Sequence, residues 1–274
     1  MEHIAATQPI GVFDSGIGGL TVVRALMERL PFEHIVYFGD TARVPYGVKS
    51  VETITHFTHQ IAEFLLQQQV KMLIIACNTM AAVAATSVRA QAVVPVLDVI
   101  DAGAIAACAA TQQGSIGVIG TPTTVNSNAY AQRIHRLNPA LRVYSQACPL
   151  FVPLVEEGWT HDPVTVEVAS RYLRELQEKD IDTLILGCTH YPLLRSTIGQ
   201  IMGDGVTLVN PAYETARALR ELLKEHGIES DGHEEEEFPY RFYVSDAEER
   251  FQEFAGSILP YDVRMTKQIN IEEY

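Results

Sequence analysis

Two of the four cysteines, Cys77 and Cys188, occupy similar settings in the sequence. Each ends a short apolar run and precedes polar residues that favour a helix start, in the segments LIIACNT (73–79) and LILGCTH (184–190). A thiol at a helix N-terminus lies at the positive end of the helix dipole, which lowers its pKa from about 8.5 toward neutrality. We therefore expect both cysteines to exchange protons near neutral pH.

A pair of such thiols suits inversion at a carbon that carries an acidic hydrogen. One thiolate removes the proton from one face of the carbon, and a thiol on the opposite face returns a proton. A single fixed base would reach only one face and would mostly restore the starting configuration. The pairing of Cys77 with Cys188, rather than either residue alone, points to this chemistry.

The other two cysteines, Cys108 and Cys148, lie in segments typical of small core residues. No two cysteines form a CxxC pair, and none has zinc-finger spacing to another cysteine or to a histidine. We expect four free thiols and no bound metal.

A glycine-rich turn, DSGIGG (14–19), follows the first apolar run. It has neither the GxGxxG order nor the lysine of a phosphate-binding loop, so we favour backbone N–H groups that meet a carboxylate over a nucleotide cradle. Asp14 could orient the cysteine of its own half or bind a substrate ammonium group. It could also be a helix N-cap.

Four further residues have both a functional and a structural interpretation. Tyr46 and Gly47, in the loop GDTARVPYG (39–47), could present a hydroxyl and an amide to a ligand or could form only a turn. His190 could tune Cys188 or could be structural. Glu156 could belong to a site or to the solvated surface.

Short β-branched runs alternate with amphipathic stretches of helical length. Strands are predicted at Ile10–Phe13, Ile35–Phe38, Met72–Ala76, Val93–Leu97, Ile116–Ile119, Val143–Ala147, Thr183–Leu186 and Thr207–Val209. Helices are predicted at Leu20–Leu30, Val51–Gln69, Pro163–Lys179 and Tyr213–His226. This alternation predicts an α/β fold of mainly parallel sheets flanked by helices, with ligands bound beyond the carboxyl ends of the strands.

The chain also repeats itself in order. IGVFDS (10–15) returns as IGVIGT (116–121), and LIIACNT (73–79) returns as LILGCTH (184–190). The two offsets are 106 residues (from 10 to 116) and 111 residues (from 77 to 188), which favours a duplicated unit. Two such halves facing one another would place Cys77 and Cys188 on opposite sides of one cleft.

Charge and hydropathy exclude several classes of protein. Acidic residues outnumber basic ones by 34 to 20, and the net charge of −14 argues against binding to nucleic acid. Part of this excess lies in the acidic segment 229–237, which we expect to be a solvated loop. There is neither a membrane-length apolar run nor a signal-peptide pattern, so we expect a cytoplasmic protein without a membrane partner.

On these residues the sequence resembles the glutamate racemases of the aspartate/glutamate racemase superfamily. The matching segments occur in the expected order over most of the chain: GVFDSGIGGLTV (11–22), YFGDTARVPYG (37–47), IIACNTMAA (74–82), IGVIGTPTTV (116–125), PLVEEGW (153–159) and LILGCTHYPLL (184–194).

The resemblance implies two pseudo-symmetric α/β domains around a buried glutamate, with domain one at residues 1–100 and 210–274 and domain two inserted at 101–209. It implies that Cys77 and Cys188 interconvert L- and D-glutamate as acid and base. In this arrangement Asp14 assists Cys77, whereas Glu156 and His190 assist Cys188. The implied substrate contacts are Asp14, Ser15, Tyr46, Gly47, Asn78, Thr79, Thr121, Thr123, Thr189 and His190.

The resemblance also implies a reaction without pyridoxal phosphate or metal, a role in supplying D-glutamate for peptidoglycan, and a homodimer. Some members carry an N-terminal extension and need a peptidoglycan precursor as activator. Only nine residues precede Ile10, so we expect no such dependence.

Three alternatives stay open at the level of the sequence. The first is an aspartate racemase or a related isomerase of another small diacid. The second is a two-lobed binding protein for a small anion, which would explain the duplication but not a cysteine in each half. The third is a thiol redox protein, which would need Cys77 and Cys188 within disulfide distance.

Overall fold

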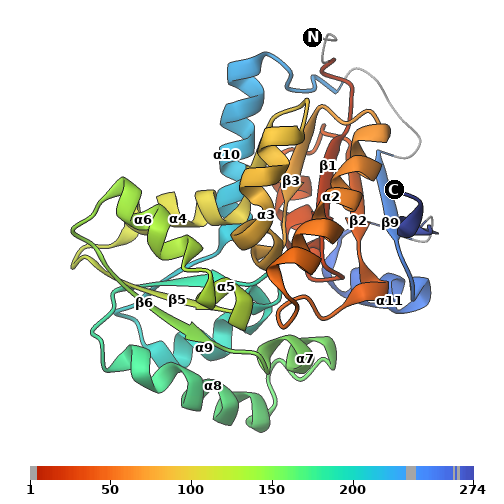
Figure 1. The fold of residues 1–274 in the computed structure, drawn as a ribbon. Coiled ribbons are helices and arrows are strands. Elements are labelled where there is room, and N and C mark those ends of the chain that lie inside the picture. Colours follow the sequence, from red (N-terminus) through yellow and green to blue (C-terminus); the bar gives the residue numbers. More distant parts are fainter. Residues whose placement is uncertain (1–4, 233–238, 262, 264–265) are drawn as a thin grey trace.

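The computed structural model describes residues 5–232, 239–261, 263 and 266–274. Two parallel sheets flanked by helices lie side by side, as the alternating pattern predicted (Figure 1). Of the predicted acidic loop, residues 233–237 lie outside the described residues.

The first sheet has the order β10-β9-β2-β1-β3-β4, and its neighbouring strands pair in parallel. Its strands are β1 (Ile10–Asp14), β2 (Ile35–Gly39), β3 (Met72–Ile75), β4 (Val96–Asp98), β9 (Tyr240–Val244) and β10 (Lys267–Gln268). Strands β1, β2 and β3 are buried along their whole length, which explains their nearly continuous apolar sequences.

The second sheet has the order β6-β5-β7-β8, which repeats the order β2-β1-β3-β4 of the first. Its strands are β5 (Ser115–Gly120), β6 (Arg142–Ala147), β7 (Thr183–Gly187) and β8 (Thr207–Val209). The registers match as well, because Phe13 pairs with Ile75 in one sheet and Ile119 pairs with Leu186 in the other. Each cysteine follows its strand residue by two positions, so the predicted repeat corresponds to a structural one.

The helices pack on these sheets and on each other. They are α1 (Leu20–Arg29), α2 (Val51–Gln67), α3 (Asn78–Gln91), α4 (Val99–Ala110), α5 (Pro122–Asn126), α6 (Ala129–Leu137), α7 (Phe151–Glu156), α8 (Pro163–Gln177), α9 (Arg195–Met202), α10 (Pro211–His226) and α11 (Glu248–Ile258), with 3₁₀-turns η1 (Thr41–Arg43), η2 (Tyr191–Leu194) and η3 (Ile271–Glu273). α2 and α3 lie side by side on the face of the first sheet that Figure 1 turns toward the viewer, whereas α1 packs against α10 and α11.

Local signals explain where the predicted helices begin. Ser50 caps α2 by accepting a hydrogen bond from the Thr53 amide, and Asp162 caps α8 in the same way ahead of a proline. Asn210 caps α10, which ends at Gly227 in the left-handed conformation. The four predicted helices therefore agree with the structure to within two residues at each end.

α4 joins the two halves, since it packs against α10 on one side and against α6 and β7 on the other. Side chains of both sheets, such as Ile74 and Ile185, belong to one continuous core. The predicted boundary between residues 100 and 101 falls inside α4, within its first turn.

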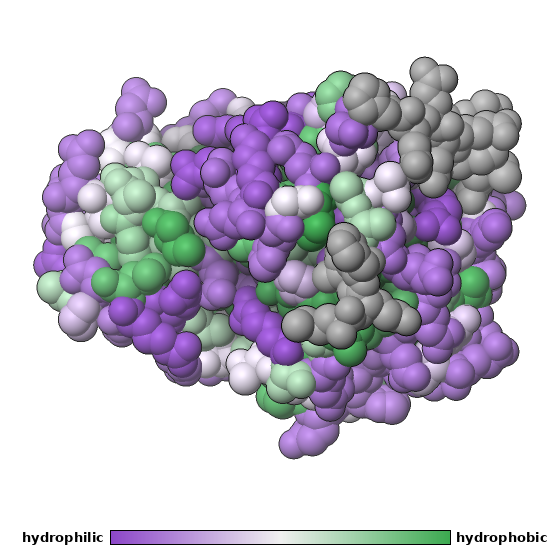
Figure 2. Space-filling model, turned by 90° about the horizontal axis from the view of Figure 1, so that it is seen from above, coloured by the Kyte–Doolittle hydropathy of each residue, from purple (hydrophilic) through white to green (hydrophobic). Residues whose placement is uncertain are grey.

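Seen from above, the surface is mostly hydrophilic, as expected for a chain with a net charge of −14 (Figure 2). Hydrophobic side chains gather mainly toward the end that carries α4 and α6 (Figure 2). Ile105 of α4 and Leu137 of α6 are among the exposed apolar residues. None of the described helices is both long enough and apolar enough to span a membrane.

Candidate active site

A cavity of about 390 Å³ lies where the carboxyl ends of β1, β3, β5 and β7 come together. The strand order reverses between β1 and β3 in the first sheet and between β5 and β7 in the second, and such a switch point leaves a crevice for a ligand at the strand ends. The cavity is lined by Ser15, Gly16, Val44, Pro45, Tyr46, Gly47, Val48, Cys77, Asn78, Thr79, Thr121, Pro122, Pro149, Val152, Pro153, Glu156, Cys188, Thr189 and His190. The two cysteines thus reach one cavity from different sheets.

Cys77 is the N-cap residue of α3 and is only 5% exposed. Its Sγ lies 3.4 Å from the Ser15 hydroxyl. Burial, reinforced by the nearby Asp14 carboxyl, raises the pKa of Cys77 to about 12. The prediction of a lowered pKa is therefore wrong for Cys77, because desolvation and a neighbouring carboxyl outweigh the helix dipole.

Cys188 follows β7 and is also buried. Its loop leads into the 3₁₀-turn η2 rather than directly into an α-helix, so the predicted helix start is displaced to α9. The Cys188 Sγ lies 3.9 Å from Nδ1 of His190. The two cysteines therefore have different electrostatic surroundings.

His190 links Cys188 to a carboxylate. Its Nε2 lies 3.0 Å from Oε1 of Glu156. Burial opposes the charged imidazolium, but hydrogen bonds to Cys188 and Glu156 outweigh it and raise the pKa of His190 to about 10. Burial also opposes the Glu156 carboxylate, yet the His190 hydrogen bond and the charges of His190 and Arg250 give it a lowered pKa.

Asp14 lies behind Cys77 and does not line the cavity. The carboxyl is 1% exposed; its Oδ2 accepts a hydrogen bond from the Gly16 amide at 3.1 Å, and Oδ1 accepts one from the Thr189 hydroxyl at 3.5 Å. Burial raises its pKa. Asp14 is not a helix N-cap, because α1 begins after Gly19 without a side-chain cap.

Hydrogen bonds at the cavity cross between the halves. The Thr79 and Thr121 hydroxyls lie 2.9 Å apart, and the Tyr130 hydroxyl donates to Oδ1 of Asn78 at 2.6 Å. From the other side, the Thr21 hydroxyl lies 2.9 Å from the carbonyl of Thr189. The residues after each cysteine are therefore held by the opposite half of the chain.

The loop that carries Tyr46 and Gly47 closes another side of the cavity. The Tyr46 hydroxyl donates to the buried carboxylate of Asp40. The Thr123 hydroxyl donates to the Gly47 carbonyl at 2.9 Å and does not line the cavity. The structure thus separates Thr123, which supports this loop, from Thr121, which reaches the cavity.

Two groups of residues at or near the cavity were not predicted from the sequence. Asp40 lies in the loop GDTARVPYG, but nothing in its spacing indicates that this carboxylate turns inward. Pro149, Val152 and Pro153 form part of an apolar wall at α7. Apolar lining residues give no signal in a single sequence, because they cannot be told from core residues.

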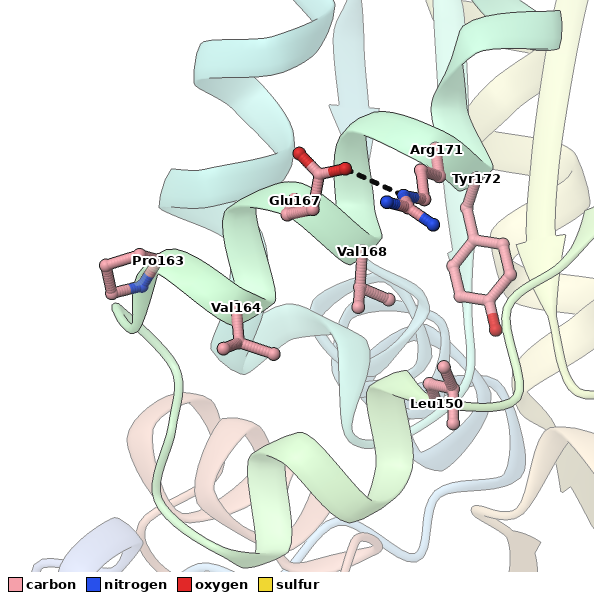
Figure 3. Close-up of a pocket in the computed structure, with 7 residues that line it drawn as sticks. All are labelled: Leu150, Pro163, Val164, Glu167, Val168, Arg171 and Tyr172. Atoms are coloured by element: carbon pink, nitrogen blue, oxygen red, sulfur yellow. Dashed lines mark hydrogen bonds and ion pairs between the residues drawn. The ribbon is translucent and has the colours of Figure 1, made fainter.

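Another cavity, of about 510 Å³, lies on the outer face of α8 (Figure 3). Val164, Val168 and Leu150 line it, and its charged residues, Glu167 and Arg171, are paired with each other at 2.7 Å. With no convergent acid, base or nucleophile, it offers no comparable chemistry. Within the part of the chain that the structure describes, no cluster of three His, Cys, Asp or Glu side chains is placed to hold a metal ion.

The chain is similar to known proteins over most of its length. The family model for Asp/Glu/Hydantoin racemase matches residues 10–230. A glutamate racemase of Syntrophus aciditrophicus is 61% identical over 258 residues, which cover 92% of this chain and 94% of that protein.

Solved structures agree. The chain superposes on a glutamate racemase isoform of Bacillus anthracis with a TM-score of 0.92 at 40% identity, over 96% of this chain and 97% of that one. It superposes on the glutamate racemase of Francisella tularensis in complex with D-glutamate with a TM-score of 0.91 at 43% identity, over 98% and 100% of the two chains. The family match covers well over half of the sequence, and the chain belongs to the Asp/Glu/hydantoin racemase family.

Proposed function

We propose that this chain is a cofactor-independent glutamate racemase that uses Cys77 and Cys188 as its two acid–base groups. The observation that carries the proposal is that these two cysteines, equivalent in the repeat, line one cavity from different sheets. The likeness to glutamate racemases, one of them in complex with D-glutamate, supports the choice of substrate.

The proposed reaction moves one proton off the α-carbon and one proton on. The thiolate of one cysteine takes the α-proton, and the electron pair of the broken C–H bond remains on the substrate as a carbanion next to the carboxylate. The thiol of the other cysteine then protonates the opposite face and becomes a thiolate. The reverse reaction exchanges these roles, so both hands of glutamate are substrates.

The surroundings of the two sulfurs differ. The raised pKa of Cys77 keeps it a thiol at neutral pH. The His190 imidazolium lies beside Cys188, with Nδ1 at 3.9 Å from that sulfur. Cys77 is thus held as a thiol that can donate a proton, whereas an imidazolium lies beside Cys188.

Hydroxyl and amide groups around the cavity suit a substrate with two carboxylates. Ser15, Thr79, Thr121 and Thr189 offer hydroxyls, and the N-terminus of α3 at Asn78 offers backbone N–H groups and the positive end of its dipole. We assign Tyr46, Gly47 and His190, which line the cavity, to positioning or polarising the substrate, whereas Asp14 acts through Cys77. Thr123 acts indirectly, by holding Gly47.

The wider role follows from this activity. We propose a cytoplasmic homodimer that supplies D-glutamate for peptidoglycan. We also propose that residues 1–100 with 210–274 and residues 101–209 are its two domains, consistent with the membership of the two sheets.

The experiment that tests the activity offers L-glutamate and L-aspartate in parallel to the purified protein, without added cofactor. Optical activity should be lost with glutamate alone, and Cys77→Ser should abolish this loss while glutamate still binds. Inversion of aspartate instead would move the activity to an aspartate racemase. If both amino acids kept their configuration, the racemase proposal would fail and a two-lobed binding protein would take its place.

A further inference from the structure

Arg250 of α11 makes an ion pair that leads into the candidate active site. Its Nη2 lies 3.2 Å from Oε2 of Glu156, whose other oxygen, Oε1, lies 3.0 Å from Nε2 of His190. His190 in turn reaches Cys188 through Nδ1. A continuous series of contacts therefore connects an arginine outside the cavity to one of the two sulfurs.

α11 is fixed in a register that presents Arg250 to this series. The next residue, Phe251, is fully buried and stacks on Tyr37 with ring centroids 5.9 Å apart. Four residues after Arg250, on the same face of the helix, the ring of Phe254 lies 6.4 Å from that of His190. Tyr37 belongs to the first sheet and Glu156 to the second half, so the Arg250–Glu156 pair joins the two halves beside Cys188.

We propose that Arg250 is a positioning residue, which holds the Glu156 carboxylate against His190 and so keeps the imidazolium beside Cys188. The inference rests on the proposed racemase function. Arg250 does not line the 390 Å³ cavity, so it acts through Glu156 rather than on the substrate.

The contact between Glu156 and His190 sets the direction of the expected effect. Three groups lie near the His190 ring: Cys188 in the loop after β7, Asp14 at the end of β1 and Glu156 at the end of α7. Two charged residues come from α11. Arg250 pairs with Glu156, and Glu253 lines a second cavity that Glu156 and Arg250 also line. Loss of Arg250 leaves Glu156 freer to turn away from His190. His190 would then lose its proton at lower pH.

The pair is accessible to salt, because the Arg250 side chain is 60% exposed and both partners line an adjoining cavity of about 470 Å³. Exposed ion pairs have modest effects, so Arg250→Gln should lower kcat/KM for glutamate by about three-fold. Salt should lower the activity of the wild-type protein toward that of the variant and change the variant little. Arg250→Lys should restore part of the loss.

Arg171→Gln is the matched control, because Arg171 also forms an ion pair on a helix, with Glu167, but neither residue lines the active-site cavity. It should leave kcat/KM and its salt dependence unchanged. Thermal melting of both variants reports any general loss of stability.

A double-mutant cycle with Glu156→Gln separates positioning from a merely structural role. If Arg250 acts through Glu156, then Arg250→Gln should cause no further loss in the Glu156→Gln background, and the alkaline decline of kcat/KM should begin at lower pH in Arg250→Gln alone. Full activity of Arg250→Gln, or an equal loss in both backgrounds, would overturn the inference. Failure of the racemase proposal is distinguishable, because the wild-type protein itself would then leave glutamate unchanged.

Discussion

The two cysteines are equivalent in the repeat, but their neighbours are not. When the strand registers of the two sheets are matched, Asp14 is equivalent to Gly120 and Thr79 is equivalent to His190. One thiol therefore has a carboxyl behind it, whereas the other has an imidazole beside it. Divergence at these positions therefore gives the two equivalent thiols different surroundings.

The pH dependence of activity should report His190. Its pKa is raised from 6.5 to about 10, so the imidazolium persists through neutral pH and is lost as the pH rises through about 10. We expect kcat/KM to decline there in the wild-type protein. In His190→Asn it should be lower by roughly 10²-fold at pH 8, with that alkaline decline removed. An unchanged alkaline limb in the variant, measured from pH 6 to pH 11, would show that another group controls it.

At the scale of elements, the turn after β1 must approach the loop after β7 closely. A Cβ atom at Gly18 would lie 2.4 Å from both Cε1 of His190 and Oγ1 of Thr189. Glycine is thus required here by close packing between the halves. The His190–Cys188 geometry depends on it.

Gly18→Ala should therefore displace His190 and lower kcat/KM by about 10- to 100-fold, since small misplacements of catalytic groups are costly. Gly199→Ala is the control, because its nearest new neighbour would be 3.6 Å away and the residue lies within α9. That variant should keep full activity and gain about 0.4–1 kcal/mol of stability. Equal kinetics in the two variants would mean that the Gly18 contact does not position the site.

Elements differ in how far the sequence could predict them. The strands of both sheets that carry the site were predicted because their buried runs and following polar residues are local patterns. The elements β9, β10 and α11 were not predicted, and neither was the contact between Arg250 and Glu156. Pairing between segments that are distant in the sequence leaves no periodic signal. The raised pKa of Cys77 was missed for a similar reason, since burial is a property of the packed fold.

At the scale of the whole molecule, the cavity has walls from both halves, and the apolar core runs continuously between them. Hydrogen bonds such as Thr79–Thr121 and Tyr130–Asn78 cross the same boundary. A ligand in the cavity should therefore stabilise the chain as one unit.

Glutamate at a saturating concentration should shift the whole unfolding transition of the protein to a higher temperature. At a concentration about 100 times its Kd, the gain is about 2.7 kcal/mol. The same shift should occur with Cys77→Ser, because that variant is expected to bind without inverting the substrate. If calorimetry resolved two transitions and glutamate moved only one, the ligand site would belong to a single half.

The use of two opposed bases is the central claim, and the fate of the α-hydrogen tests it most directly. L-glutamate is converted in heavy water, and deuterium is measured at early times in both the D-glutamate formed and the L-glutamate that remains. Two bases predict deuterium at the α-carbon of the product and almost none in the remaining substrate, because the proton leaves to one sulfur and deuterium arrives from the other. Deuterium entering both pools at similar rates, or α-protium carried into the product, would contradict the two-cysteine account and indicate one base that serves both faces.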